Sequence, residues 1–97
     1  LGNFTCIVDY NHSGDRALML GDLSAKFHSF GWRVADIDGH DHEQIESALR
    51  PREGSKPLAI IASTIKGHGC KAMENNPAWH HKAPSLDELE GLLLQLQ

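Results

Sequence analysis

Residues Pro57-Leu58-Ala59-Ile60-Ile61-Ala62 form an almost uniformly apolar run in the second half of the chain. A run of this length and composition is typical of a strand that is buried on both faces of a parallel sheet. The polar segment Arg52-Glu53-Gly54-Ser55-Lys56 precedes it and has the composition of a linker. The pattern therefore predicts that residues 58–62 are a strand of a parallel sheet, the third one in the chain.

Two earlier segments have strand patterns, and a helix pattern lies between them. Residues 5–8 are apolar and rich in β-branched side chains, and a strand pattern resumes over residues 32–37. Between these segments, apolar residues recur at three- and four-residue steps, which places them on one face of a helix that Gly31 can terminate. These apolar residues are Leu20, Leu23, Phe27 and Phe30. We expect this helix to cover the sheet.

A second helix is predicted between the second and third strands. Asp41 and Gln44 have the spacing of an N-terminal cap, and Pro51 stops the helix that they begin. Ile45 and Leu49 lie on one face of it. A last helix begins at the end of the chain with a capping box, and its leucine stripe is suited to a core or an interface. The residues of this helix pattern are Ser85 and Glu88 for the capping box and Leu86, Leu89, Leu92, Leu93 and Leu96 for the stripe.

This order of elements predicts an α/β fold, a parallel sheet with flanking helices and right-handed crossovers. Ligands of such sheets bind beyond the carboxyl ends of the strands, where the polar segments after Val8, Ile37 and Ala62 fall. Residues 65–84 form a long connection rich in glycine, proline, asparagine and histidine, and connections of this length are often functional. That connection is the main candidate for a site.

Composition favours one compact globular unit without a nucleic-acid or membrane partner. The 97 residues are 40% hydrophobic, and their formal net charge is -4 with no block of more than two basic residues. No apolar run approaches the roughly 20 residues that span a bilayer, and no signal-peptide pattern occurs at the start of the chain. Cys6 and Cys70 lack the spacing of a disulfide framework or a zinc site, so we expect a cytoplasmic protein with reduced thiols.

The loop after the first strand carries four oxygen donors: Asp9, Asn11, Ser13 and Asp15. Donors of this kind suit a hard cation such as magnesium. Asn and Asp also hydrogen-bond their own backbone in ordinary turns, and for an isolated segment this structural interpretation is the more frequent one. The residues themselves leave both interpretations open.

Two segments after the third strand could contact phosphate. In Thr64-Ile65-Lys66-Gly67-His68-Gly69-Cys70, glycines allow close backbone approach and Lys66 offers a compact positive charge, although a surface turn explains the segment equally well. In the segment from Glu74 to Pro84, His80 beside Trp79 could bind phosphate or exchange protons. His80 and His81 have no cysteine or aspartate at a zinc spacing, which argues against zinc. The cluster 38–42 is best explained as a turn that caps the next helix.

Six motifs occur in one order along the chain, and together they resemble the amino-terminal, thiamine-diphosphate-binding domain or subunit of transketolases. They are the segments Ile7–Asn11 (IVDYN), Phe30–Trp32 (FGW), Asp38–Asp41 (DGHD), Thr64–Gly69 (TIKGHG), Met73–Asn76 (MENN) and Trp79–Pro84 (WHHKAP). The match covers nearly the whole chain. It implies that residues 1–97 are a single partial domain, the C-terminal portion of the domain that binds the cofactor diphosphate.

The resemblance assigns roles to four residues. Asn11 would be a side-chain ligand of the divalent metal, usually Mg²⁺ or Ca²⁺, that holds thiamine diphosphate in this family. Ser13 would offer its backbone carbonyl to the same metal. Lys66 would lie near the diphosphate, and His80 would contact both the diphosphate and the donor substrate as the catalytic residue.

The chain departs from the family pattern in four places. The Gly-Asp-Gly segment that supplies the carboxylate ligand of the metal does not occur in these 97 residues. Ser13 stands where isoleucine or leucine is usual, and His81 stands where glycine is common. There is also no counterpart of the pyrimidine-binding domain, so we expect a partial site that has negligible activity alone.

The resemblance implies that the parent protein transfers a two-carbon ketol unit between sugar phosphates. Its partner would be the pyrimidine-binding domain or subunit, in a homo- or hetero-oligomer. Two alternatives stay open. One is a non-catalytic interaction module that keeps the sheet and the leucine-striped helix. The other is a related thiamine-diphosphate enzyme such as a deoxyxylulose-phosphate synthase, which the segments at 73–76 and 79–80 disfavour.

Overall fold

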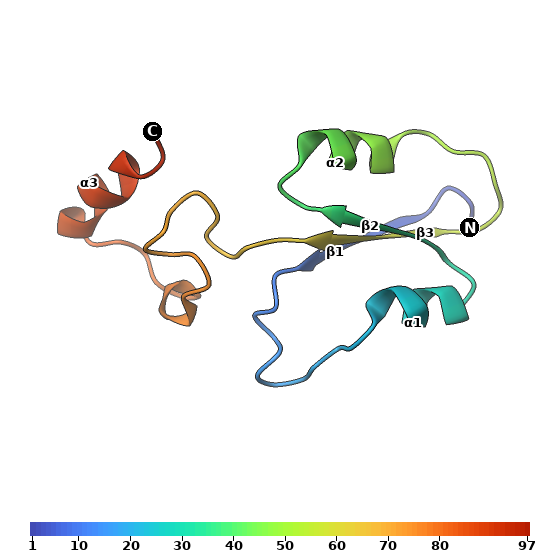
Figure 1. The fold of residues 1–97 in the computed structure, drawn as a ribbon, viewed down its shortest axis with the longest axis horizontal. Coiled ribbons are helices and arrows are strands. Elements are labelled where there is room, and N and C mark those ends of the chain that lie inside the picture. Colours follow the sequence, from blue (N-terminus) through green and yellow to red (C-terminus); the bar gives the residue numbers. More distant parts are fainter. The chain divides into compact units, whose positions relative to one another are not determined.

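The computed structural model describes all 97 residues, which fall into two compact units, Leu1–Thr64 and Ile65–Gln97. The first unit contains a sheet and two helices, and the second contains a short 3-10 helix and the last α-helix (Figure 1). The single partial domain expected from the sequence stays a prediction, because two compact units can both belong to one domain of a longer protein. None of the helices has the length and apolar character needed to cross a bilayer.

Three parallel strands form the sheet of the first unit: β1 (Thr5–Tyr10), β2 (Arg33–Asp38) and β3 (Leu58–Ser63). β3 is the central strand, in the order β1-β3-β2. Residues 58–62 are each at most 7% exposed, whereas β1 alternates between exposed and half-buried residues. The prediction of a parallel α/β fold with a third strand buried on both faces is therefore confirmed.

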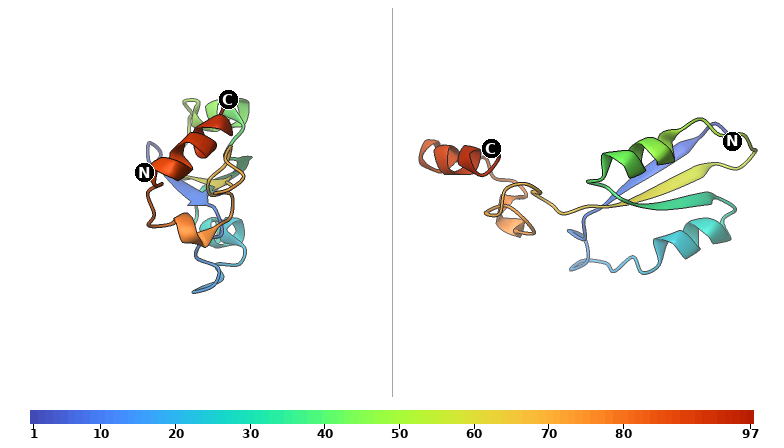
Figure 2. Two further views of the ribbon diagram at one scale, coloured as in Figure 1. Left: turned by 90° about the vertical axis from the view of Figure 1, so that its left-hand side faces the viewer. Right: turned by 45° about the horizontal axis from the view of Figure 1, so that its top comes forward.

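Two helices cover opposite faces of this sheet, as Figures 1 and 2 show. The chain runs from β1 through α1 (Leu23–Ser29) to β2 on the far side of β3, then returns through α2 (His42–Leu49) to β3. When the direction of travel reverses, crossovers of one hand place their helices on opposite faces. The strand order thus explains the layering, and the two crossover helices predicted from the sequence are confirmed.

The end of α1 is fixed by a glycine in the left-handed region. Gly31 has φ 82° and donates its N–H to the carbonyl of His28, while Trp32 donates to the carbonyl of Phe27. This pair of bonds is the Schellman motif, and its usual hydrophobic contact is present because the rings of Trp32 and Phe27 lie 5.2 Å apart. The predicted role of Gly31 is therefore confirmed.

The start of α1 and its buried face differ from the sequence prediction. Asp22 is the N-cap and accepts a hydrogen bond from Ala25, so Leu20 lies outside the helix. Phe30 is 83% exposed rather than part of a buried face. The helix is shorter than the apolar periodicity suggested, because a capping side chain decides where the first turn begins.

The second helix is capped as predicted, but a different residue is buried. The Asp41 side chain accepts hydrogen bonds from the backbone N–H groups of Glu43 and Gln44. These bonds, that of Gln44 above all, lower the pKa of Asp41 below its usual value. Ala48 is buried against the sheet, whereas Leu49 is 51% exposed. The main core cluster consists of Ala48, Leu58 and Ile60, with Ala35 and Ile37 packed against it.

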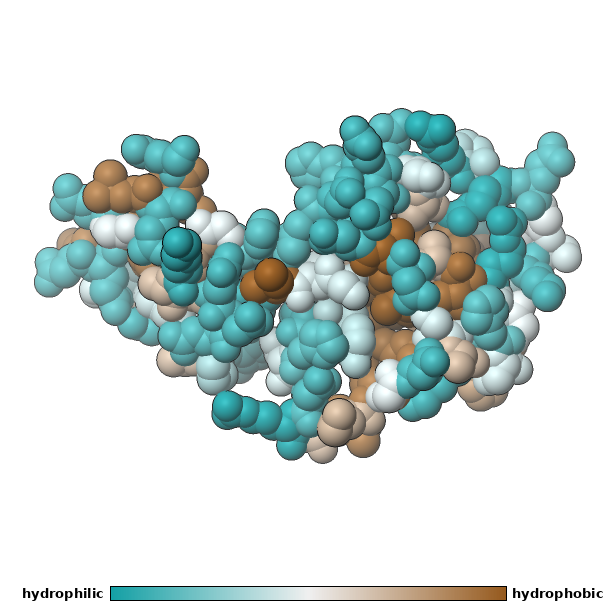
Figure 3. Space-filling model, in the orientation of Figure 1, coloured by the Kyte–Doolittle hydropathy of each residue, from teal (hydrophilic) through white to brown (hydrophobic).

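The second unit is built from η1 (Pro77–Trp79) and α3 (Leu86–Leu94). Ser85 and Glu88 form the predicted capping box at the start of α3. Of the predicted leucine stripe only Leu92 is buried, at 8% exposure, and its buried companion in this unit is Cys70. The exposed members are Leu86, Leu89 and Leu93, joined by Leu94 within α3 and by Leu96 just after it. Hydrophobic residues are visible at the surface of this unit in Figure 3.

The three strands end at the same level, because Tyr10, Ser63 and Asp38 are paired across the sheet. Gly39, directly after β2, donates its N–H to the Ser63 carbonyl at 2.7 Å. A Cβ added at Gly39 would lie 2.4 Å from Thr64 Cγ2 and 3.0 Å from the Ser63 oxygen. This edge therefore has no room for a side chain at position 39.

Gly39→Ala should destabilise the first unit by about 1–3 kcal/mol, the usual cost of overpacking. Thr64→Ser removes the clashing methyl group and keeps the hydroxyl, so the double variant should recover part of the loss. Urea unfolding of the wild type, both single variants and the double variant measures this coupling. Gly14→Ala is the control, because nothing lies within 4 Å of a Cβ there. Strict additivity of the two changes would contradict the steric explanation.

The capping box of α3 should weaken in acid. Lys82 Nζ donates to Glu88 Oε1 at 2.5 Å and the Ser85 N–H donates to Oε2 at 2.9 Å, which lowers the pKa of Glu88 from 4.5 to about 2. A carboxylate whose pKa is lower in the folded state than in the unfolded state stabilises the fold at pH values above its unfolded-state pKa. This stabilisation is lost as the pH falls through its folded-state pKa. The contribution is small, because both side chains are about 40% exposed.

We therefore expect the first turn of α3 to fray between pH 4.5 and about 2. Backbone carbon chemical shifts of residues 85–89 measure this fraying. Glu88→Gln should abolish the pH dependence in that range, and Glu90→Gln on the same helix should preserve it. A transition that survives in Glu88→Gln would show that another group is responsible.

Candidate functional site

The carboxyl edge of the sheet is held together by one side-chain contact between β1 and the residue after β3. The Thr64 hydroxyl donates to Asp9 Oδ1, and the Thr64 N–H donates to the Tyr10 carbonyl at 3.2 Å. Together these bonds fix the point at which the chain leaves β3. Sequence reasoning missed this pairing, because the partners are 55 positions apart, although both are polar residues at strand ends.

The loop after β1 is an ordered turn around Asn11. Asn11 Oδ1 accepts the Ser13 N–H at 2.9 Å, an Asx turn. His12 has φ 61°, its ring centroid lies 4.2 Å from that of Tyr10, and its Nδ1 is 2.9 Å from Asp15 Oδ2. A non-glycine residue held at positive φ is uncommon. The turn, one of the two interpretations that the sequence allowed, is therefore present at Asn11. These contacts fix the direction of the Asn11 side-chain oxygen.

The turn remains compatible with a metal ligand but does not complete a metal site. An amide oxygen has two lone pairs, so Asn11 Oδ1 keeps one after accepting the Ser13 N–H. Together with the Ser13 carbonyl it offers the oxygen donors that Mg²⁺ and Ca²⁺ prefer. No group of three or more His, Cys, Asp or Glu side chains in this structure could hold a metal. The donor set of this chain is therefore partial.

The Asp38–His42 segment is a turn that caps α2. Asp38 Oδ1 accepts the His40 N–H at 2.9 Å, and Asp41 caps the helix. The structural interpretation of this cluster is confirmed. Together with Gly39 it forms the part of the carboxyl edge that follows β2.

In the second unit, a closed loop brings Lys66 toward the segment that carries His80. The Asn75 N–H donates to the Lys66 carbonyl at 2.9 Å, so the two ends of the loop meet. Gly67, at φ 77°, makes this possible, because a Cβ there would lie 2.7 Å from the backbone of Met73. Lys66 is therefore presented from a tightly defined turn.

His80 is placed by the short helix η1. The Asn76 side chain caps η1 by accepting the Ala78 N–H at 3.1 Å, and Pro77 fixes its first turn. The His80 N–H donates to the Pro77 carbonyl at 3.1 Å, which ends the helix at this residue. The Asn-Asn-Pro sequence thus fixes the backbone position of His80 through local bonds.

Lys66 and His80 are in direct contact. Lys66 Nζ lies 2.5 Å from His80 Nδ1. An ammonium group has only donors, so Nδ1 accepts and a neutral His80 ring carries its hydrogen on Nε2. The ammonium and the Nε2–H group are both hydrogen-bond donors, a pairing suited to an anionic oxygen ligand.

The neighbours of His80 make different contacts. The rings of His80 and His81 are perpendicular, with centroids 4.3 Å apart, and these two residues belong to no metal-binding group. Lys82 Nζ lies 4.1 Å above the Trp79 ring and is also bonded to Glu88. Lys82 is therefore engaged by an aromatic ring and a carboxylate, whereas Lys66 contacts the imidazole.

The predicted site residues are distributed over the two units. Lys66 and His80 meet in the second unit, and Asn11 and Ser13 form the turn in the first. The prediction that an amide oxygen, an ammonium and an imidazole surround one pyrophosphate stays a prediction. The structure shows that Lys66 and His80 contact each other.

Comparison with known proteins points to a single family. Residues 1–95 match the model of the transketolase, thiamine diphosphate binding domain family. The chain is 37% identical over 76 residues to one subunit of the apulose-4-phosphate transketolase of Actinobacillus succinogenes, covering 77% of this chain and 28% of that protein. It is 31% identical over 97 residues to the protein of the same name from Phocaeicola vulgatus, covering 93% of this chain and 34% of that protein. Human transketolase is 33% identical over 87 residues, covering 84% of this chain and 14% of that protein.

The contact between Lys66 and His80 predicts the tautomer of the histidine. When the His80 ring is neutral, long-range proton–nitrogen correlation spectra should show its hydrogen on Nε2. Lys66→Met removes the donor and should allow both tautomers, whereas Lys71→Met, in the same loop, should leave the spectrum of His80 unchanged. A wild-type ring with hydrogen on Nδ1 would rule out the contact.

Proposed function

This chain belongs to the transketolase thiamine-diphosphate-binding family, and from that premise we propose that it forms the diphosphate-binding part of a transketolase-type enzyme. The parent protein would transfer a two-carbon ketol unit between sugar phosphates with thiamine diphosphate and a divalent metal. The contact between Lys66 and His80 is the observation that carries this proposal. In this contact a lysine ammonium lies beside an imidazole group in the second unit.

Lys66 and His80 would bind the cofactor diphosphate from one side. A lysine ammonium serves phosphate as a compact point charge, and its charge-assisted hydrogen bonds are among the stronger ones in proteins. In this arrangement Lys66 also keeps the hydrogen of His80 on Nε2. His80 could therefore donate to a diphosphate oxygen or exchange a proton with a substrate hydroxyl through that nitrogen.

Asn11 and Ser13 would contribute to the divalent metal. The Asx turn leaves one lone pair of Asn11 Oδ1 available and holds the side chain in a defined direction. The Ser13 carbonyl would be the second oxygen donor. A carboxylate from elsewhere in the enzyme would have to complete the set, because this chain has no suitable acidic cluster.

Thiamine diphosphate, when bound, supplies the carbon nucleophile that breaks and forms the carbon–carbon bond. The residues of this chain would anchor and orient the charged end of the cofactor. His80 would hold or move a proton at a substrate hydroxyl. The difficult chemistry thus belongs to the cofactor, and the protein supplies binding and proton transfer.

A partner is part of this proposal. The chain spans 28% and 34% of the two apulose-4-phosphate transketolase relatives, and their names indicate an enzyme with more than one kind of subunit. We therefore propose that a pyrimidine-binding domain or subunit completes the site within a homo- or hetero-oligomer, and that this chain alone has negligible activity. A cytoplasmic location fits an enzyme of sugar-phosphate metabolism.

Titration of the assembled enzyme with thiamine diphosphate and Mg²⁺ tests the proposal. Asn11→Ala and Lys66→Met should each weaken cofactor binding by at least tenfold, about 1.4 kcal/mol, because each removes a direct contact. Calorimetry gives the affinity, and coupled assay of ketol transfer gives the activity.

Matched controls separate these effects from general damage. Asn3→Ala and Lys71→Met change the same residue types outside the proposed site and should bind the cofactor normally. Unchanged affinity in Asn11→Ala would refute the metal assignment alone. No cofactor binding even with the pyrimidine-binding partner present would refute the enzyme proposal and favour a non-catalytic interaction module.

A further inference from the structure

A cleft of about 250 Å³ lies at the amino ends of the three strands, at the opposite end of the sheet from the strand-end turns described above. The first residues of the strands, Thr5, Arg33 and Leu58, all line it and are paired with one another in the sheet. Leu49, at the end of α2, forms another wall. The half-exposed state of Leu49 follows from its position at this opening.

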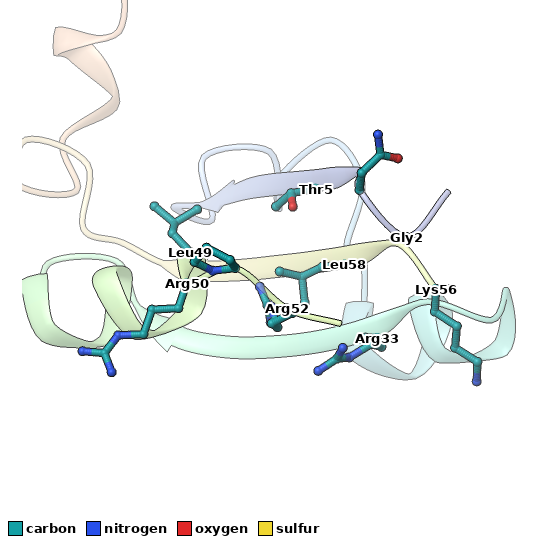
Figure 4. Close-up of a pocket in the computed structure, with 10 residues that line it drawn as sticks. Gly2, Thr5, Arg33, Leu49, Arg50, Arg52, Lys56 and Leu58 are labelled. Carbon is teal, nitrogen blue, oxygen red and sulfur yellow. The ribbon is translucent and has the colours of Figure 1, made fainter. Parts of the chain in front are cut away.

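The cleft concentrates positive charge in an acidic protein. Its ten lining residues include four cations and no carboxylate; the cations are Arg33, Arg50, Arg52 and Lys56. These are four of the nine Lys and Arg residues of a chain whose formal net charge is -4. In the sequence three of them fall within residues 50–56, and Arg33 lies apart from these. The fold collects them from the start of β2 and from the linker between α2 and β3 (Figure 4).

Two of the guanidinium groups are held in place by the backbone. Arg33 donates to the Glu53 carbonyl at 3.2 Å, and Arg52 donates to the Ala48 carbonyl near the end of α2. Each bond uses one of five N–H groups, so most of the donors of both side chains remain for a ligand. A guanidinium fork that is already oriented loses little entropy when it binds an oxyanion.

The other two cations behave differently. Arg50 points away from the cleft in Figure 4 and pairs with Glu46 at 3.2 Å, so it is partly neutralised. Lys56 also extends away from the cleft in Figure 4, but it forms no hydrogen bond or ion pair, so its flexible side chain can turn toward a ligand. Arg33, Arg52 and Lys56 are therefore the residues on which anion binding depends.

We propose that this cleft is an anion site for phosphate, either inorganic phosphate or the phosphate group of a small metabolite. Its volume is below the roughly 300–1,000 Å³ of pockets for drug-sized ligands, which favours a small ligand. Two guanidinium groups and an ammonium supply the positive charge and the hydrogen-bond donors that a phosphate dianion requires. The site shares no residue with the proposed cofactor contacts and does not rest on the proposed function.

The test is a nuclear magnetic resonance titration of the full chain with inorganic phosphate, ribose 5-phosphate and ribose at constant ionic strength. Phosphate and ribose 5-phosphate should saturate shifts at residues 33, 52 and 56, and ribose should not. Tighter binding of ribose 5-phosphate than of phosphate would identify a phosphate ester as the ligand. Equal affinities would identify the free anion.

Variants distinguish binding at a defined site from weak attraction to positive charge anywhere on the surface. Arg33→Gln and Arg52→Gln should each weaken binding by about tenfold, the effect of one charge-assisted hydrogen bond to a ligand. Lys56→Gln should weaken it several-fold without disturbing the fold, since Lys56 has no internal partner. Arg16→Gln, an exposed cation in the loop after β1, is the control and should bind as the wild type does.

Chemical-shift changes at Lys66 and His80 would come from phosphate bound at the proposed cofactor contacts. They should persist in Arg33→Gln, because Arg33 is not part of those contacts. Two results would overturn the proposal. One is the absence of saturable shifts at the cleft with either phosphate ligand. The other is an equal loss of affinity in Arg16→Gln and Lys56→Gln.

Discussion

The outer strands β1 and β2 hydrogen-bond only to β3, so the burial of this central strand constrains the whole first unit. Its five apolar residues lose nearly all contact with solvent, which fixes which strand lies in the middle. The register then makes all three strands end together at Tyr10, Asp38 and Ser63. A carboxyl edge with turns on neighbouring strands and an amino edge with a cleft both follow from this one arrangement.

The second unit depends on local polar bonds more than on apolar burial. Leu92 and Cys70 are its buried apolar residues, while the Gln95 side chain accepts hydrogen bonds from Cys70 and from the Ala72 backbone. The loop that presents Lys66 is closed by Asn75, and η1 is capped by Asn76. Side chains with short reach thus set the position of His80. This explains how a small unit can bring an ammonium and an imidazole into contact.

Sequence patterns predicted the elements well, because helices and buried strands leave local signals. The apolar run at 58–62, the cap at Asp41 and the capping box at Ser85 each depend on residues within a few positions of one another. The start of α1 was wrong because apolar periodicity continues through Leu20, whereas the Asp22 cap decides the first turn. The bond between Thr64 and Asp9 could not be predicted, since the two residues are 55 positions apart and meet only through the strand order. The approach of Arg33 to the cations of residues 50–56 could not be predicted for the same reason. The contact of Lys66 with His80 likewise depends on the closure of the loop, and the spacing of apolar residues in the sequence does not indicate such a closure.

The distribution of charge in the first unit has a consequence at distances beyond any hydrogen bond. Asp9 lies one residue before the end of β1, Asp38 ends β2, and Asp41 follows β2. Carboxylates thus gather at one end of the sheet, while the cationic cleft occupies the other end. Such a separation gives the unit an electric polarity along the strand axis, and at low ionic strength its field reaches about 10 Å or more into the solvent. A charge separation of this kind favours the approach of cations to one end of the three strands and of anions to the other.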